Sequence, residues 1–386
     1  MTTLLTDEQC LLRDSVRDLL AAEFPIASTR HWLEADPDEQ GRLASAAWQR
    51  FAEQGWLGVA WPESCGGAGL GLVEQCLVLC ELGRVLRPSG YLSTLVAGTI
   101  LLEAGEDATA TALSEITAGG RICAVVPPAQ SATLEFEPGD GTGSVQSPDG
   151  GCEVRLSARE GGSVLDGESG FVAEAVFADS LLVAAAESEG GWSWALVSVD
   201  APGVRREERE TMDGTRPLSR VVFDGAPVQR VGAAGAGAAL WAAAAPVWWL
   251  ALAAESVGAS EQVLADSVAY AKEREQFGRP IGVNQAIQHR CADMFVRAEG
   301  ARAITWHAAR ELDAGAPGAR SACSMAKAYA TEAGLENARD GIQIHGGVGF
   351  TWEFDCHFFY KRARASEITA GHPDEHREAV AREAGL

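Results

Sequence analysis

The sequence has little positive charge for its length. Its 386 residues include 31 Lys and Arg against 54 Asp and Glu, which leaves a formal net charge of −23 at pH 7. Nucleic acids and anionic membrane surfaces attract proteins through basic side chains, so this balance opposes both kinds of partner. We therefore expect a chain that binds neither nucleic acid nor a membrane.

The sequence also lacks paired cysteines and an export signal. Its nine cysteines are an odd number, are scattered and include no CxxC pair, which is typical of reduced thiols packed as small hydrophobic residues. The opening residues MTTLLTDEQC are acidic where a secretory signal is basic and then apolar. These features predict a cytoplasmic location.

One stretch lacks charge altogether, between Arg230 and Glu255. Its length would admit a membrane span. However, most of its residues are Ala and Gly, Pro246 lies in its second half, and Ala contributes little to membrane insertion compared with Leu or Ile. We interpret it as a buried loop between domains that continues into a core helix.

The pattern of apolar residues changes twice along the chain. Helical spacing runs from Thr6 to about Thr117 and opens with a Thr-Asp capping signal, and short β-type runs separated by Gly, Ser, Pro and Asp follow. Helical spacing then returns, in segments near 240–273, 284–312, 317–344 and 352–367. This order predicts an α+β fold. The expected domains are a helical domain at 1–120, an antiparallel β-domain at 121–232 and a helical domain at 233–386.

Two long motifs carry a resemblance to a known family. REQFGRPIGVNQAIQHRCADM at 274–294 and GIQIHGGVGF at 341–350 resemble the C-terminal domain of acyl-CoA dehydrogenases. WQRFAEQGWLGVAWPESCGGAGLG and FADSLLVAA resemble parts of that family's N-terminal and middle domains, so the similarity spans nearly the whole chain. The resemblance implies an N-terminal α-helical domain, a middle antiparallel β-domain and a C-terminal four-helix bundle.

The resemblance also implies a reaction, the FAD-dependent desaturation of an acyl-CoA thioester between Cα and Cβ. This chemistry needs a base for the α-proton, a flavin N5 that accepts the β-hydride, and hydrogen bonds to the thioester carbonyl. Electron-transferring flavoprotein is the electron acceptor that the resemblance implies.

The standard positions of the base hold other residues. EITAGHPDEHR places Ala370 where most family members have Glu, and the position used by a minority of members falls on Trp248 and Trp249. None of these side chains accepts a proton. Asp374 and Glu375 remain as candidates for a relocated base, although acids before an apolar run are more typical of a solvated helix start.

Three further groups stand near the standard base positions. They are Glu255, His372 and His376, and each is an open candidate for proton transfer. No separate ligand cluster accompanies His372, Asp374 and His376, so we expect no metal site.

The segments that line the flavin ring in this family are altered. AVVPPAQSAT at 124–133 has Pro127-Pro128 where Glu-Pro would stand, and proline offers no backbone N–H. GFVAEAVFADS at 170–180 places Phe171 and Ala173 at the family's Trp and Thr positions. We expect the flavin ring to be poorly held by this chain's own β-domain.

The residues that hold the adenosine and pyrophosphate end of FAD are retained. An Arg fork suits pyrophosphate, and glycines let the backbone approach a ligand closely. Taken singly, His345 is typical of a core histidine and Gly346-Gly347 of a tight turn, but the joint spacing favours a cofactor site. In this family these groups reach the FAD of the neighbouring subunit. The residues are Arg274, Phe277, Gln285, Gln343, Ile344, His345, Gly346 and Gly347.

The base and the flavin-ring residues are lost, whereas the residues for the adenosine and pyrophosphate end of FAD are retained. Together these observations favour a division of labour between two subunits. Our hypothesis is a non-catalytic subunit of a heteromeric α₂β₂ acyl-CoA dehydrogenase, similar to those of actinobacterial steroid side-chain degradation, with a homologous catalytic partner. Three alternatives stay open: a self-sufficient dehydrogenase with a relocated base, a flavin monooxygenase of the same fold, and a flavin-free interaction protein.

Overall fold

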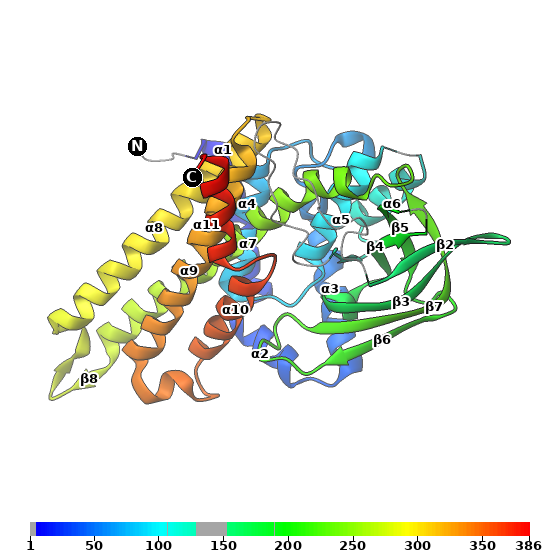
Figure 1. Ribbon diagram of the computed structural model, residues 1–386. Coiled ribbons are helices and arrows are strands. Elements are labelled where there is room, and N and C mark those ends of the chain that lie inside the picture. The colour runs from blue at the N-terminus through cyan, green and yellow to red at the C-terminus, as the bar shows by residue number, and fades with distance from the viewer. Residues whose placement is uncertain (1–4, 106, 129–152, 189) are drawn as a thin grey trace. The chain divides into compact units, whose positions relative to one another are not determined.

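The computed structural model describes residues 5–105, 107–128, 153–188 and 190–386 (Figure 1). These residues group into two compact units that draw on non-consecutive segments. Unit 1 comprises the described residues of 5–31, 72–87 and 249–377, and unit 2 comprises those of 32–71, 88–248 and 378–386. The domain boundaries at 120 and 232 stay a prediction.

Helices form the first third of the chain. Thr6 begins the first helix as expected, because its side chain accepts from Gln9 N at 3.2 Å while Gln9 Oε1 accepts from Thr6 N at 3.0 Å. The α-helices are α1 (Asp7–Glu23), α2 (Ile26–Glu34), α3 (Pro37–Glu53), α4 (Leu72–Val85), α5 (Tyr91–Ala104) and α6 (Asp107–Thr117). Two short 3-10 turns, η1 (Trp56–Gly58) and η2 (Glu63–Cys65), lie between α3 and α4.

A seven-stranded sheet follows in unit 2. Five strands pair in a closed ring in the order β4–β2–β3–β7–β5, while β1 adds to β4 and β6 adds to β7. The strands are β1 (Cys123–Val126), β2 (Arg155–Arg159), β3 (Gly162–Ala173), β4 (Ser180–Glu187), β5 (Trp192–Ser198), β6 (Val204–Arg209) and β7 (Leu218–Val231), with the short turn η4 (Ala175–Phe177) before β4.

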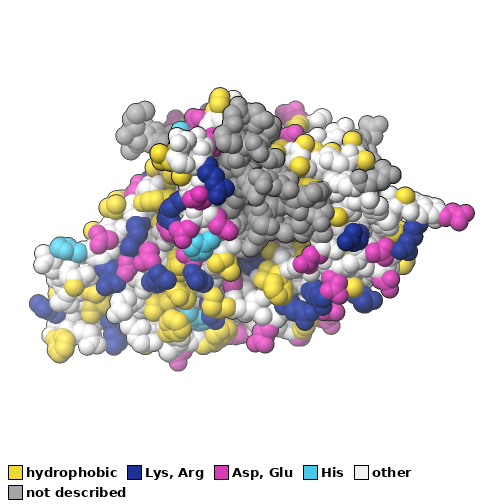
Figure 2. Space-filling view, in the orientation of Figure 1, with side chains coloured by type: hydrophobic (Ala, Val, Ile, Leu, Met, Phe, Trp, Pro, Cys, Tyr) yellow, Lys and Arg dark blue, Asp and Glu magenta, His cyan; other side chains and the backbone are white. Residues whose placement is uncertain are grey.

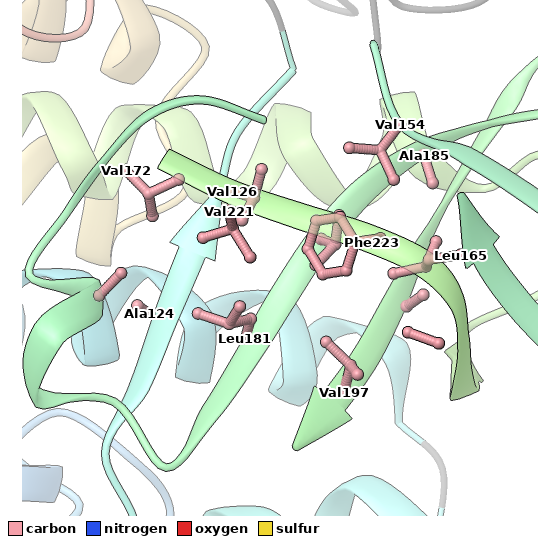
Figure 3. Close-up of a cluster of buried hydrophobic side chains, with 14 of the residues drawn as sticks. Ala124, Val126, Val154, Leu165, Val172, Leu181, Ala185, Val197, Val221 and Phe223 are labelled. Carbon is pink, nitrogen blue, oxygen red and sulfur yellow. The ribbon is translucent and has the colours of Figure 1, made fainter. Parts of the chain in front are cut away.

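Apolar side chains from several strands fill the inside of this ring. Leu165, Leu181, Val197, Val221 and Phe223 converge there (Figure 3), and each is buried. Buried residues alternate along the first part of β7, at Ser219, Val221 and Phe223, which is the period of two that half-buried strands show. The predicted β-domain is therefore present, and it closes around one core.

Strand direction differs in part from the expectation. β1 and β2 each pair with β4 in parallel, whereas the other pairings of this sheet are antiparallel. Alternation of apolar residues indicates that a segment is a strand, but it carries no information on the direction of the neighbouring strand.

Long helices return after the sheet, and the first four of them agree with the predicted segments within four residues. They are α7 (Gly237–Glu273), α8 (Gln285–Asp313), α9 (Ala319–His345), α10 (Cys356–Ile368) and α11 (Pro373–Glu383). The short elements between them are β8 (Glu275–Gln276), β9 (Arg279–Pro280), η5 (Ile281–Val283) and η6 (Gly346–Phe350). The α+β fold class is confirmed.

Helix α7 contains most of the charge-free stretch. It is long and apolar enough to cross a membrane by length and composition, but 72% of its most apolar window is buried inside the protein. It behaves as the core helix that the sequence suggested, and it begins six residues after Val231, so the preceding loop is short.

Two glycines set the close crossing of α4 and α7 in unit 1. A Cβ added to Gly258 would lie 1.7 Å from the carbonyl oxygen of Cys80, and one added to Gly83 would lie 2.2 Å from that of Glu255. Any larger residue would push the helices apart, so both positions require glycine.

The charged side chains are mixed on the face of the molecule shown in Figure 2. Dark-blue Lys and Arg side chains lie among magenta Asp and Glu side chains there. Basic side chains are thus present on this face although acidic residues outnumber basic ones in the chain. Basic groups that have no acidic partner are candidates for binding an anionic ligand.

Candidate functional site

The retained motif residues meet at one end of the unit 1 helices. Helix α7 ends at Glu273, and Arg274 leads into the β8–β9 hairpin, which turns into the start of α8 (Figure 1). The hairpin turn consists of Phe277 with φ 53° and Gly278 with φ 75°. A two-residue turn with two positive φ values matches the twist of its strands, but it strains a residue that carries a side chain. Phe277 is nevertheless 99% exposed.

His345 joins the end of α9 to the end of α7. Its ring stacks on Tyr270 with centroids 4.2 Å apart, and its Nδ1 lies 2.7 Å from the carbonyl oxygen of Gly341. The neighbouring Ile344 is buried in the same helix end. His345 therefore orders the bundle end through its own packing, and direct contact of its ring with a cofactor stays a prediction.

The two motif glycines stand in open space. Gly346 has φ 70° and ψ −148°, a conformation that is essentially limited to glycine. A Cβ built on Gly346 or Gly347 meets no heavy atom within 4 Å among the described residues. The first glycine is thus required by the backbone, and both leave the backbone accessible.

Three polar side chains at this end have no binding partner in the described part of the chain. Arg274, Gln285 and Gln343 are exposed, and none has a side-chain hydrogen bond or ion pair with a described residue. A guanidinium with a free face suits a pyrophosphate, and primary amides suit phosphate or ribose oxygens. The residues present therefore fit the diphosphate half of FAD, presented from outside this unit.

The segment that would carry the catalytic carboxylate is held by buried polar groups. Ala370 lies between α10 and α11, has φ 58° and is 1% exposed. Lys327 of α9 donates to the carbonyl oxygens of Glu367, at 2.8 Å, and of Gly371. His376 of α11 has Nε2 3.0 Å from the carbonyl oxygen of Ala370. The turn is thus fixed on both sides of Ala370.

The hydrogen bonds define the protonation of His376. Its Nδ1 lies 2.7 Å from Ser324 Oγ, so the hydroxyl donates to Nδ1 while Nε2–H donates to the carbonyl oxygen. Burial, together with the neighbouring Lys327 ammonium, lowers the pKa of His376 to about 3. Burial also lowers the pKa of Lys327 to about 7. His376 is therefore neutral and structural at physiological pH.

The neutral state of His376 predicts a loss of stability in acid. Between about pH 6.5 and pH 3 the unfolded chain binds a proton at His376 that the folded chain does not, so the free energy of unfolding falls as pH falls. We expect His376→Gln to flatten this decline between pH 6.5 and 4.5, as measured by urea unfolding. His289→Gln, which changes an exposed histidine of α8, should leave the wild-type slope. Parallel curves for the wild type and H376Q would contradict the prediction.

The sequence interpretation missed this cluster. Lys327 is the single charged residue of SACSMAKAYA, a run that otherwise reads as core. A lone charge on an apolar helix face, three residues after Ser324, was the available signal. Its partners are backbone carbonyl groups, which no sequence pattern identifies.

The two tryptophans at the alternative base position pack within the protein. Trp249 is buried, meets the His376 ring edge-on at 5.2 Å, and lies below the Arg320 guanidinium at 4.8 Å. Trp248 is half-buried and contacts Trp241 edge-on at 5.6 Å. Both act as packing aromatics, and neither offers a proton acceptor.

The candidate relocated bases lie at the exposed start of α11. Asp374 pairs with Arg377 at 3.0 Å, and Glu375 accepts from the backbone N–H of His372 at 2.6 Å. Glu375 thereby satisfies a free donor of the helix start. These contacts agree with the solvated helix start that we favoured. Glu255 is half-buried, with Arg362 at 3.9 Å.

No group of three or more His, Cys, Asp or Glu is placed to hold a metal ion in the described part of the chain. His376 in particular uses both ring nitrogens within the protein.

The flavin-ring segments are only partly described. Phe171 and Ala173 end β3, opposite Arg220 and Leu218 of β7, and Phe171 is 69% exposed. Pro127 directly follows β1, while 129–133 of the altered motif lie outside the described residues. Neither position carries the Trp or Thr side chain that the resemblance led us to expect.

Comparison with known proteins agrees with this geometry. The profile of the acyl-CoA dehydrogenase C-terminal domain matches residues 246–385, and that of the N-terminal domain matches residues 6–120. The acyl-CoA dehydrogenase IpdE2 of Mycobacterium tuberculosis is 32% identical, with 96% of this chain and 95% of that protein covered. FadE34 of the same organism is 33% identical over 94% of this chain, which spans 46% of FadE34, about half its length.

Solved structures are similar over the whole chain. The ChsE4–ChsE5 complex from Mycobacterium tuberculosis contains a chain that is 28% identical, with a TM-score of 0.82 and coverage of 100% of this chain and 99% of that one. A variant of the Tcur3481–Tcur3483 steroid ACAD is 29% identical, with a TM-score of 0.82 and 99% coverage of both chains.

The chain belongs to the acyl-CoA dehydrogenase family, which consists of flavoprotein oxidoreductases whose cofactor is FAD.

Proposed function

We propose that this chain is the non-catalytic subunit of a heteromeric acyl-CoA dehydrogenase and completes the FAD site of a homologous partner. One observation carries the proposal: Arg274, Gln285 and Gln343 are exposed at one bundle end without any partner among the described residues. Polar side chains that are gathered in this way, around a strained and exposed Phe277, indicate a ligand or partner that lies outside unit 1.

The state of the base position supports the proposal. Ala370 is buried in a turn that Lys327 and His376 hold in place, and Asp374 and Glu375 are used by the start of α11. A self-sufficient dehydrogenase would need a base near the thioester α-carbon. In the proposed assembly the partner supplies that base and the flavin-ring contacts.

The chemistry divides accordingly. When bound, FAD accepts the β-hydride of the acyl-CoA thioester. This chain's part is to hold the cofactor's diphosphate by the Arg274 guanidinium and by the backbone exposed at Gly346 and Gly347. Of the two structural relatives, one is a two-protein complex and the other is a steroid ACAD, which supports a heteromeric partner and a bulky acyl-CoA substrate for this chain. Electron-transferring flavoprotein is the proposed electron acceptor.

The proposal is tested by counting FAD. The chain should be purified alone and also with the homologous subunit of an adjacent gene, and bound FAD per chain and acyl-CoA-dependent bleaching of the flavin should be measured. We expect one FAD per pair of chains, with bleaching in the co-purified sample alone.

Two results would contradict the proposal. Full FAD occupancy of the isolated chain with bleaching would favour a self-sufficient dehydrogenase. Full occupancy without bleaching, combined with NADH-dependent oxygen uptake, would favour the monooxygenase.

A further inference from the structure

Unit 2 contains a cavity that is lined neither by the diphosphate residues nor by Phe171 and Ala173, although Val176, Phe177 and Asp179 follow these two positions in the same segment. It lies between α3, the loop after α6, η4 and β6, and its volume is about 350 Å³. That volume falls at the lower end of the range of small-molecule sites. The cavity therefore has room for a compact organic ligand.

Hydrogen bonds fix the walls of this cavity. Trp32 Nε1 donates to the carbonyl oxygen of Gln40 at 3.1 Å, and Gln40 Nε2 donates to that of Trp32 at 3.0 Å. On the other side, Gln49 Nε2 donates to the carbonyl oxygen of Gly119 at 2.7 Å. The walls are held by the fold itself, so a ligand would meet a preformed site and would lose little free energy in ordering it.

One wall is an aromatic corner. The rings of Trp32 and Phe177 have centroids 5.8 Å apart and planes inclined by 55°. Trp48, from the same face of α3 as Gln40 and Ala44, lines the floor. Inclined aromatic faces favour cations through their quadrupoles.

Two carboxylates line the same cavity. Asp179 and Glu208 are exposed, and neither forms an ion pair with a described residue. Asp179 uses one oxygen to accept from the Ile122 backbone N–H at 2.8 Å. The nearby basic group, Arg206, donates to the carbonyl oxygens of Ala175 and Ala178 at 2.8 and 3.1 Å and is thus engaged by η4. The guanidinium keeps its positive charge, but two carboxylates against one guanidinium still leave an excess of negative charge at the cavity.

We propose that this cavity binds a small organic ammonium compound, with the ammonium between Asp179 and Glu208 and an apolar portion against Trp32 and Phe177. A neutral ligand would gain no charge attraction from the two carboxylates, and an anion would be repelled by them. A site of this kind would place a second ligand on unit 2, independent of FAD and of acyl-CoA.

Phenethylamine is a suitable probe because it joins an ammonium to one aromatic ring. Titration calorimetry of the full chain at pH 7 should give a Kd of about 0.1–1 mM, in the range that ligand efficiency allows for nine heavy atoms. 2-Phenylethanol, its neutral counterpart of the same shape, should bind at least about tenfold more weakly. Equal affinity for the two compounds, or no binding of phenethylamine, would overturn the proposal.

Variants locate the site. Glu208→Gln should weaken phenethylamine binding roughly three- to tenfold, and Phe177→Leu should weaken it by a similar factor, through loss of the aromatic face. Glu210→Gln removes the same charge from an exposed residue just beyond β6 that does not line the cavity, and it should leave the affinity unchanged. Because Glu208 has no partner among the described residues, Glu208→Gln should fold normally. Equal effects of E208Q and E210Q would contradict a local site.

Discussion

Replacement of Arg274 by Ala should weaken FAD binding by the assembled pair of subunits about 10- to 100-fold. A hydrogen-bonded charged group contributes about 1.5–3 kcal/mol, and each 1.4 kcal/mol changes an equilibrium constant tenfold. The Arg274 side chain has no partner among the described residues, so its loss should not change the melting temperature of the isolated chain. FAD retained after gel filtration, and its release on dilution, measure the effect.

Arg310→Ala is the matched control for this experiment. Arg310 lies in the last turn of α8, whereas Gln285 begins that helix, so the control removes the same charge from the opposite end. It should leave FAD occupancy unchanged, and Arg274→Lys should fall between the wild type and Arg274→Ala, because an ammonium lacks the guanidinium fork. Unchanged FAD binding in R274A would exclude the contribution to a partner's cofactor.

Restoring the missing carboxylate by Ala370→Glu should not produce a dehydrogenase from the chain alone. Ala370 is 1% exposed, its carbonyl oxygen is bound by His376, and the carbonyl oxygen of the next residue, Gly371, is bound by Lys327. A Glu side chain there would crowd its buried neighbours, and its carboxylate would lose its contact with water. Both effects should lower the free energy of unfolding, by about 2 kcal/mol or more in total. Flavin bleaching by acyl-CoA should stay absent, and a lower urea midpoint should accompany it.

Ala370→Gly separates the effect of the backbone from that of the side chain. The φ of 58° costs a non-glycine residue roughly 1–2 kcal/mol, so glycine should maintain or raise stability at this position. An A370E chain that bleaches with acyl-CoA in the absence of a partner would show that the flavin-ring contacts are competent here, and it would refute the non-catalytic assignment.

Local signals in the sequence predicted the elements well. The Thr6 capping signal and the apolar spacing gave the first helix, and four of the five C-terminal helices, α7 to α10, lie within four residues of the predicted segments. These features depend on interactions between neighbours in the chain, so the sequence contains them directly.

Features that depend on distant contacts were not predictable in the same way. Examples are the parallel pairing of β1 and β2 with β4 and the closure of the strand ring. Both depend on how the connections bring together strands that are distant in the sequence. The motif at 341–347 indicated a cofactor site, but only the structure separates Gln343, which is exposed, from Ile344 and His345, which pack inside. Lys327 was missed because its acceptors are backbone atoms.

Phe277 contributes almost nothing to the isolated chain, since its ring is 99% exposed and its backbone is strained. Natural selection on this position can therefore act only through what the ring touches in an assembly. In a lineage that had lost the partner gene, the residue at 277 would be free to drift toward glycine, whereas the Gly83–Gly258 crossing would stay fixed by the fold. Position 277 and the two glycine positions would then accumulate substitutions at different rates within one protein.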